Sequence, residues 1–331
     1  MTQEILVGSE DIVDYVFASN LAAQEAAGDM AASQSVERVD NLLAGSPQLK
    51  TRLHYVADSG WVLCSFPLVE DTTVVEVDIT LEPDLQPLPG KDYAEEEKAA
   101  VVELVGCARR LALADELGEA RQWAHLWFFE PGPPSRDVLL EAQGLKKVST
   151  EVQGYVPIPS DPASTGVDLG DDVELVVLQD FEYSPTTEAL IPLLEEASRD
   201  TAYGFSAHEP EQWSPQRLKD LRDHYAKIHS EVITAVLMQG EKAIGMSQIS
   251  RAVGSIEGIA EQGTTVVSAS CRGKGLGIKL KRAALVAARE RWGVERVYTS
   301  NEQRNLAARA LNRRLGFQEV SRASGWESRL A

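Results

Sequence analysis

The chain has 331 residues, of which 44% are hydrophobic and 25% are charged. These values are those of an ordinary soluble globular protein, so they exclude a wholly disordered chain, and the length favours two domains over one. The formal net charge of −19 argues against a general affinity for nucleic acid or anionic membranes, because their phosphates would repel it.

The charge is distributed unevenly along the chain. Residues 251–331 carry 15 basic and 7 acidic side chains, a net charge of +8, which leaves −27 for the first 250 residues. A polyphosphate ligand would explain a basic segment in so acidic a chain.

The cysteines and the N-terminus indicate a cytoplasmic protein. Cys64, Cys107 and Cys271 form no CxxC pair, which fits a reducing compartment and argues against disulfides or a cysteine-built metal site. The first residues are acidic where a signal peptide is basic, and no apolar run is long enough to span a membrane. We therefore expect no metal and no membrane partner.

In the first half, a strand-like run ends at 72–75, a helical pattern covers 94–117 and a strand follows at 122–129. Gly144 then precedes a closing strand. The stretch 157–172 is rich in Pro, Ser and Gly and lacks a hydrophobic period, so it is predicted to be a linker.

This linker divides the chain near its middle. The predicted domains are residues 1–158 and 173–331, joined by residues 159–172. The two halves share their order of elements and a Thr-Thr-Val-Val run, at 72–75 and 264–267, which suggests a duplicated domain.

The second half alternates strands and helices. Strands are expected at 173–179, 231–238, 242–252, 259–268, 296–300 and 317–329, and helices at 186–199, 214–229, 277–292 and 304–315. The short turn at 239–241 suits a hairpin between two of these strands. A hairpin followed by strand–helix–strand crossovers predicts an α/β (α+β) fold with a mixed, mostly antiparallel sheet flanked by helices.

The most informative segment is the glycine-rich turn RGKGLG at 272–277. It follows the strand at 259–268 directly and leads at once into the helix at 277–292. Glycines allow a ligand to approach the backbone closely, and a helix N-terminus presents unpaired N–H groups and the positive end of its dipole. This arrangement favours a pyrophosphate site, although a glycine turn before a basic surface helix would look similar.

The pattern V-x-x-x-x-R-G-x-G-x-G from Val267 to Gly277 resembles the acyl-CoA-binding motif of the GCN5-related N-acetyltransferase (GNAT) superfamily. A second pattern common in that family, N-x-x-A-x-x-x-Y-x-K-x-G-F, is matched at Asn305, Ala308, Gly316 and Phe317. The resemblance covers about 170–331. The first half matches only in element order, a layout similar to that of tandem acetyltransferases of the mycothiol synthase type.

The resemblance implies that acetyl-CoA is the co-substrate. Backbone groups of Thr265, Val266 and Val267 would pair with the pantetheine arm as an added strand does, and Asn305 would meet the pantetheine region. The pyrophosphate would be held by backbone amides of Arg272, Gly273, Lys274, Gly275, Leu276, Gly277 and Ile278.

The resemblance also exposes a departure in the catalytic groups. The family often uses a tyrosine as general acid where this chain has Asn312, and a glutamate base where it has Ser300. Glu257 or Glu261 could act as base, directly or through water, and Tyr298 as acid. A carboxylate at the mouth of a strand is more often a solvated surface group, and a tyrosine there more often packs against the core. Water could also protonate the thiolate.

The segment before the hairpin is expected to line the acceptor pocket, because it combines aromatic and polar side chains without a regular period. Its members are Asp200, Thr201, Tyr203, Phe205, His208 and Trp213.

The first half is predicted not to bind CoA. Pro83, Pro87 and Pro89 cannot supply N–H groups, and three glutamates at 95–97 would repel a pyrophosphate.

The leading hypothesis is an N-acetyltransferase that moves an acetyl group from acetyl-CoA to a primary amine of a small molecule by direct attack in a ternary complex. The rival hypotheses are a catalytically silent acyl-CoA sensor and an acetyltransferase acting on proteins or peptides. We expect no nucleic-acid partner, and either a monomer or a homodimer.

Overall fold

The computed structural model describes residues 2–30, 33–69, 71–116, 120–158, 172–182, 184–200 and 210–330. The predicted linker at 159–172 lies outside the described residues, apart from Asp172. Among the described helices, none is both long and apolar enough to cross a membrane.

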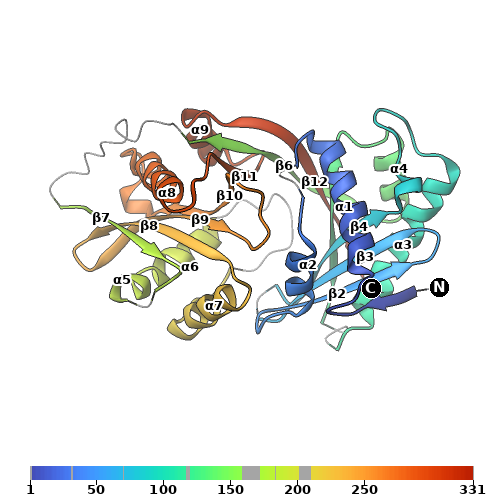
Figure 1. Cartoon of the computed structure of the whole chain (residues 1–331), viewed down its shortest axis with the longest axis horizontal. Helices are drawn as coiled ribbons and strands as arrows, with labels where there is room; N and C mark the ends of the chain where they lie inside the picture. The colour runs from blue at the N-terminus through green and yellow to red at the C-terminus, as the bar shows by residue number, and fades with distance from the viewer. Residues whose placement is uncertain are drawn as a thin grey trace. The chain divides into compact units, whose positions relative to one another are not determined.

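The chain forms two compact units (Figure 1). Within the described residues, the first unit contains residues up to 152 together with 320–330, and the second contains 153–200 and 210–319. The division therefore does not simply follow the midpoint of the chain, because the C-terminal residues belong to the first unit.

The first unit is a mixed sheet between helices. Its sheet order begins β1-β2-β3-β4-β5-β12. The elements are β1 (Thr2–Ile5), α1 (Ile12–Ala27), α2 (Val36–Leu43), β2 (Leu49–Val56), β3 (Gly60–Pro67), β4 (Val74–Leu81), the 3₁₀ turn Pro83–Leu85, α3 (Glu95–Leu113), β5 (Trp123–Glu130), α4 (Arg136–Ala142), β6 (Lys146–Pro157) and β12 (Gln318–Arg329).

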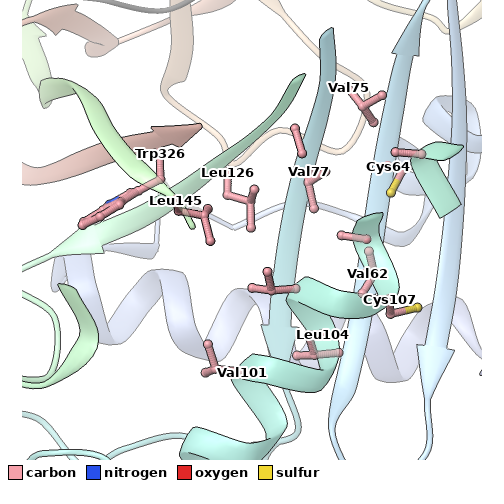
Figure 2. Close-up of a cluster of buried hydrophobic side chains, with 14 of the residues drawn as sticks. Val62, Cys64, Val75, Val77, Val101, Leu104, Cys107, Leu126, Leu145 and Trp326 are labelled. Atoms are coloured by element: carbon pink, nitrogen blue, oxygen red, sulfur yellow. The ribbon is translucent and has the colours of Figure 1, made fainter. Parts of the chain in front are cut away.

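The alternation of side chains along β3 explains why helices cover both faces of this sheet. Val62 and Cys64 point into a core with α3, whereas Trp61 and Leu63 point into a second core with α1 and α2. Successive strand residues face opposite sides, so a strand with apolar side chains on both faces must be covered on both. Figure 2 shows the core on the α3 side.

The last strand of the chain completes the first unit. β12 pairs antiparallel with β5 from Arg322↔Glu130 to Arg329↔Trp123. Its Trp326 is 1% exposed and lies in the same core as Leu104 of α3 (Figure 2). More than 180 residues separate the two paired strands, so periodicity alone could not have predicted this pairing.

The second unit has the strand order β6-β11-β10-β9-β8-β7, with β6 contributing its end. The elements are β7 (Glu174–Gln179), α5 (Pro185–Glu188), α6 (Ile191–Asp200), α7 (Pro215–Lys227), β8 (Glu231–Gln239), β9 (Lys242–Arg251), β10 (Ile259–Val267), the 3₁₀ turn Ala269–Cys271, α8 (Leu276–Trp292), β11 (Arg296–Glu302) and α9 (Leu306–Arg314).

Helices cover both faces of this second sheet as well. Figure 1 shows α8 on one side and α6 and α7 on the other. Ile233 and Ala235 of β8 belong to the core with α8, whereas Val236 belongs to the core with α6 and α7. The predicted mixed, mostly antiparallel sheet flanked by helices is confirmed in both units.

Two details of the predicted elements were wrong. The helix expected at 186–199 is two helices, α5 and α6, because Pro192 has no N–H to continue a helical hydrogen-bond ladder and instead lies in the first turn of α6. The run at 72–75 precedes or starts strand β4 rather than ending a strand, whereas 264–267 does end β10. These two Thr-Thr-Val-Val runs are therefore not equivalent positions of a repeat.

Trp326→Ala should destabilise the first unit, although residue 326 lies far from that unit's other strands in the sequence. Removing a buried tryptophan costs about 3–5 kcal/mol, measurable by urea unfolding. Phe17→Ala is the control, because Phe17 is 62% exposed, and its effect should stay within about 0.5 kcal/mol. Equal effects of the two substitutions would contradict the role of β12 in this core.

Candidate functional site: an open strand pair and a glycine turn

The central feature of the second unit is a parallel strand pair that separates. β10 and β11 pair only at Ile259↔Arg296, Ala260↔Val297 and Glu261↔Tyr298. Both strands continue beyond this point, to Val267 and Glu302. Past Glu261 and Tyr298, the two facing strand edges are therefore left with backbone N–H and C=O groups that an extended ligand can pair with.

A β-bulge marks the start of this gap. Gln262 pairs with Ile249 of β9, but Thr265 pairs with Ser247, so β10 contains one extra residue between these pairs. The side chain of Gln262 donates to the carbonyl of Gln248 and lies 3.3 Å from the Ser247 hydroxyl. The bulge changes which residues face which side and re-aims the backbone at the gap.

The glycine turn stands at the end of β10. Gly273 and Gly275 have φ values of 78° and 73°, a region that glycine adopts without strain. Gly275 is the N-cap of α8. Among the described residues, no backbone carbonyl accepts the N–H groups of Gly273, Lys274 or Gly275, and the first turn of any α-helix adds further unpaired N–H groups. The turn is exposed and therefore accessible to an anion.

Arg272 is at the predicted turn, but its side chain is bound within the protein. Its Nε donates to the carbonyl of Val267 at 2.9 Å, and its guanidinium forms ion pairs with Glu196 (3.1 Å) and Asp200 of α6. Glu196 also accepts from the N–H of Ala269 at 2.6 Å. The arginine side chain thus links the turn to α6 by ion pairs. The backbone of the turn remains available to a ligand.

The other predicted cofactor residues lie around the gap. Thr265, Val266 and Val267 are the last residues of β10, beyond the point where it leaves β11. Leu276 and Ile278 begin α8 with buried side chains. Asn305 is the N-cap of α9, where its Oδ1 accepts from the N–H of Ala308 at 3.1 Å.

Gly277 is also in the first turn of α8. A Cβ there would meet Leu311 of α9 at 3.5 Å, an ordinary contact. Neither the approach of α9 nor the backbone conformation therefore requires a glycine at this position.

The structure brings together two of the three predicted catalytic residues. Glu261 and Tyr298 are directly paired in the parallel register, so their side chains leave the sheet on one face. Arg296 is 3.4 Å from the Tyr298 hydroxyl. Burial and the carboxylate of Glu261 raise the pKa of Tyr225 on α7, which places Glu261 on the α6–α7 side. Glu257 lies in the loop before β10.

Most of the predicted acceptor segment, residues 201–209, lies outside the described residues. Asp200 ends α6, where it binds Arg272. Trp213 lies in the core beneath α6 and α7, with the guanidinium of Arg217 over its ring at 4.2 Å.

A buried polar network on the other face was not predicted from the sequence. Lys281 of α8 is 4% exposed, and its Nζ donates to Asn312 Oδ1 at 2.7 Å. Asn312 is 2% exposed and donates to Asn301 Oδ1 at 2.5 Å. A signal was present, because Lys281 occupies the apolar stripe of α8 between Gly277 and Leu285.

The first unit has the same strand opening without the turn. β4 pairs parallel with β5 only from Val74 to Val77 and then continues to Leu81. The 3₁₀ turn Pro83–Leu85 follows. At the N-terminus of α3, the side chain of Glu97 accepts a hydrogen bond from the N–H of Ala94 at 2.8 Å. A carboxylate thus occupies the helix N-terminus that would have to receive a phosphate.

Comparison with known proteins agrees with this architecture. Residues 193–317 match the acetyltransferase (GNAT) family. A tandem GNAT protein from the clavulanic acid biosynthesis pathway has 19% sequence identity and a TM-score of 0.73, with 100% of this chain and 98% of that chain covered.

Two further solved structures are similar to this chain. A GCN5-related N-acetyltransferase from Sphaerobacter thermophilus has 16% identity and a TM-score of 0.65, with 100% of this chain and 95% of that one covered. A glucosamine N-acetyltransferase region of a fungal multi-domain beta-N-acetylglucosaminidase has 12% identity and a TM-score of 0.59, with 98% of this chain and 38% of that one covered. No curated protein matches the sequence.

The residues that match the family run from α6 to α9 and include β10, α8 and β11, which build the gap and the turn. The structural matches extend the likeness over the whole chain at the level of fold. Residues 193–317 therefore match the acetyltransferase (GNAT) family, and the chain as a whole has a fold similar to that of tandem GNAT proteins.

Proposed function

We propose that the chain transfers an acetyl group from acetyl-CoA to a primary amine of a small molecule in a ternary complex. The observation that carries this proposal is the gap between β10 and β11, which begins at Glu261 and Tyr298 and ends beside the glycine turn. A single extended molecule with an anionic end fits such a path, and acetyl-CoA has that form.

The glycine turn is suited to binding the pyrophosphate of CoA at one end of the gap. Within the described part of the chain, the N–H groups of Gly273, Lys274 and Gly275 have no backbone acceptor. These N–H groups and the positive end of the α8 dipole favour an anion. Since the corresponding helix end of the first unit is capped by Glu97, we expect one CoA per chain.

The bulged part of β10 is suited to binding the pantetheine arm and the thioester. The edge of Thr265, Val266 and Val267 that faces away from β9 is not paired with β11, so it can bind amide groups of the arm as an added strand would. Backbone N–H groups fixed by the bulge would also stabilise the oxyanion that forms as the amine attacks.

Glu261 is the stronger of the two candidate bases. It is exposed at the point where the strands separate and stands beside Tyr298, so an amine entering from the α6–α7 side would meet both. Its carboxylate would remove a proton from the amine, directly or through water. The Tyr298 hydroxyl, close to Arg296, would orient the amine.

A small amine acceptor is favoured by two observations. One structural relative is described as a glucosamine N-acetyltransferase region, and the acidic remainder of the chain attracts cations by long-range electrostatics. Release of CoA with a panel of amino sugars, polyamines and amino acids, compared with a peptide array, distinguishes this proposal from a peptide acetyltransferase. Turnover with neither set would favour an acyl-CoA sensor.

Gly275→Glu should weaken CoA binding by about 100-fold or more, the loss of two charge-assisted hydrogen bonds, as measured by calorimetry. Gly240→Glu is a matched control, because Gly240 also has a positive φ (60°) and open space around it, but lies in the β8–β9 turn. Equal affinity of the two variants, or two CoA molecules per wild-type chain, would contradict the assigned site.

Glu261→Gln should lower kcat for the best amine by about 100-fold, the usual contribution of a general base, with CoA affinity unchanged. Glu257→Gln should leave kcat near that of the wild type, because Glu257 lies outside the paired part of β10. The reverse order of effects in steady-state assays would transfer the role to Glu257.

A further inference from the structure

Lys281 is the most unusual charged residue of the second unit. Its side chain lies in the interior at 4% exposure, and its Nζ donates to a neutral amide oxygen, Asn312 Oδ1, at 2.7 Å. Burying an ammonium group is costly unless a negative charge compensates for it. A residue kept there without a carboxylate partner suggests that an anion reaches it during function.

The charged groups of the neighbouring elements do not supply that anion among the described residues. Glu302, at the end of β11, accepts from the backbone N–H of Arg304, and Arg309 of α9 donates to the carbonyl of Gln303. Burial lowers the pKa of Lys281 to about 8. The ammonium is therefore able to release its proton near neutral pH.

The hydrogen bonds connect this lysine to the wall of the gap. Asn312 receives a hydrogen bond from Lys281 and donates one to Asn301 at 2.5 Å. Asn301 lies three residues beyond Tyr298, on the part of β11 that has left β10. The network therefore reaches the same opening as the Glu261–Tyr298 pair.

The network and that pair lie on opposite faces of the sheet. Val297 packs into the core beneath α8, so the alternating residue Asn301 faces α8 and α9, whereas Tyr298 faces the other side. When an amine adds to the thioester carbon from the Glu261 side, the other substituents of that carbon, sulfur included, bend towards the opposite face. The leaving group is thus directed to the face that holds Lys281.

We propose that Lys281 is the group that stabilises and protonates the leaving CoA thiolate. This inference rests on the proposed function. The amine nitrogen forms a bond to the thioester carbon, the carbon–sulfur bond breaks and its electron pair stays on sulfur. Lys281 transfers a proton from Nζ to that sulfur and becomes a neutral amine. Solvent then returns the proton, and Asn312, which is itself bound to Asn301, accepts a hydrogen bond from Nζ.

The test measures the pKa of the CoA thiol while CoA is bound to the full chain. Thiolate absorbance is titrated against pH, with the complex of desulfo-CoA, which lacks the sulfur, as the blank. A nearby ammonium lowers a thiol pKa by about one unit or more. We expect such a decrease with the wild type and with the exposed-site control Lys242→Met, and none with Lys281→Met.

Lys281→Arg separates charge from proton transfer and provides a second variant if Lys281→Met does not fold. Its guanidinium keeps a positive charge but does not release a proton, so the thiol pKa should stay low while kcat falls by about 100-fold. An unshifted thiol pKa in the wild type, or the same shift with Lys281→Met, would overturn the assignment. Failure of CoA to bind the wild type would instead refute the proposed function.

Discussion

The separation of β10 from β11 is the feature on which the rest of the site depends. A parallel pair that stayed in register to the end of both strands would satisfy its own backbone groups and leave none for a ligand. Here the pairing stops at Glu261 and Tyr298, and the bulge after Gln262 turns the remaining strand. Through the opening, a ligand can reach backbone groups inside the sheet. At the same place, the two faces of the sheet carry chemically different side chains.

The two units differ in the features that an anion site would need. Both open a parallel strand pair, but β10 is followed by glycines and an exposed helix N-terminus, whereas β4 is followed by prolines and a helix capped by Glu97. The uneven charge of the sequence, +8 after residue 250 and −27 before it, follows this difference. The basic segment contains the turn, and the acidic remainder contains its closed counterpart.

The sequence was most informative where function depends on local backbone structure. The glycine turn could be recognised because its glycines and the start of α8 are contiguous, and most elements of the second unit were predicted within a few residues. The side-chain partners could not be predicted, since they depend on distant elements. Arg272 is engaged by α6, and Asn312 contacts a lysine 31 residues away. The pairing of β12 with β5 could not be predicted for the same reason.

Hydrogen–deuterium exchange of the full chain with and without CoA tests most directly whether the gap and the turn form the ligand path. We predict slower exchange in the peptides that cover 263–267 and 273–278, because their backbone N–H groups acquire acceptors. Peptides covering 94–97 at the start of α3 should remain unchanged. Protection at α3, or none along β10 and the turn at saturating CoA, would contradict the account.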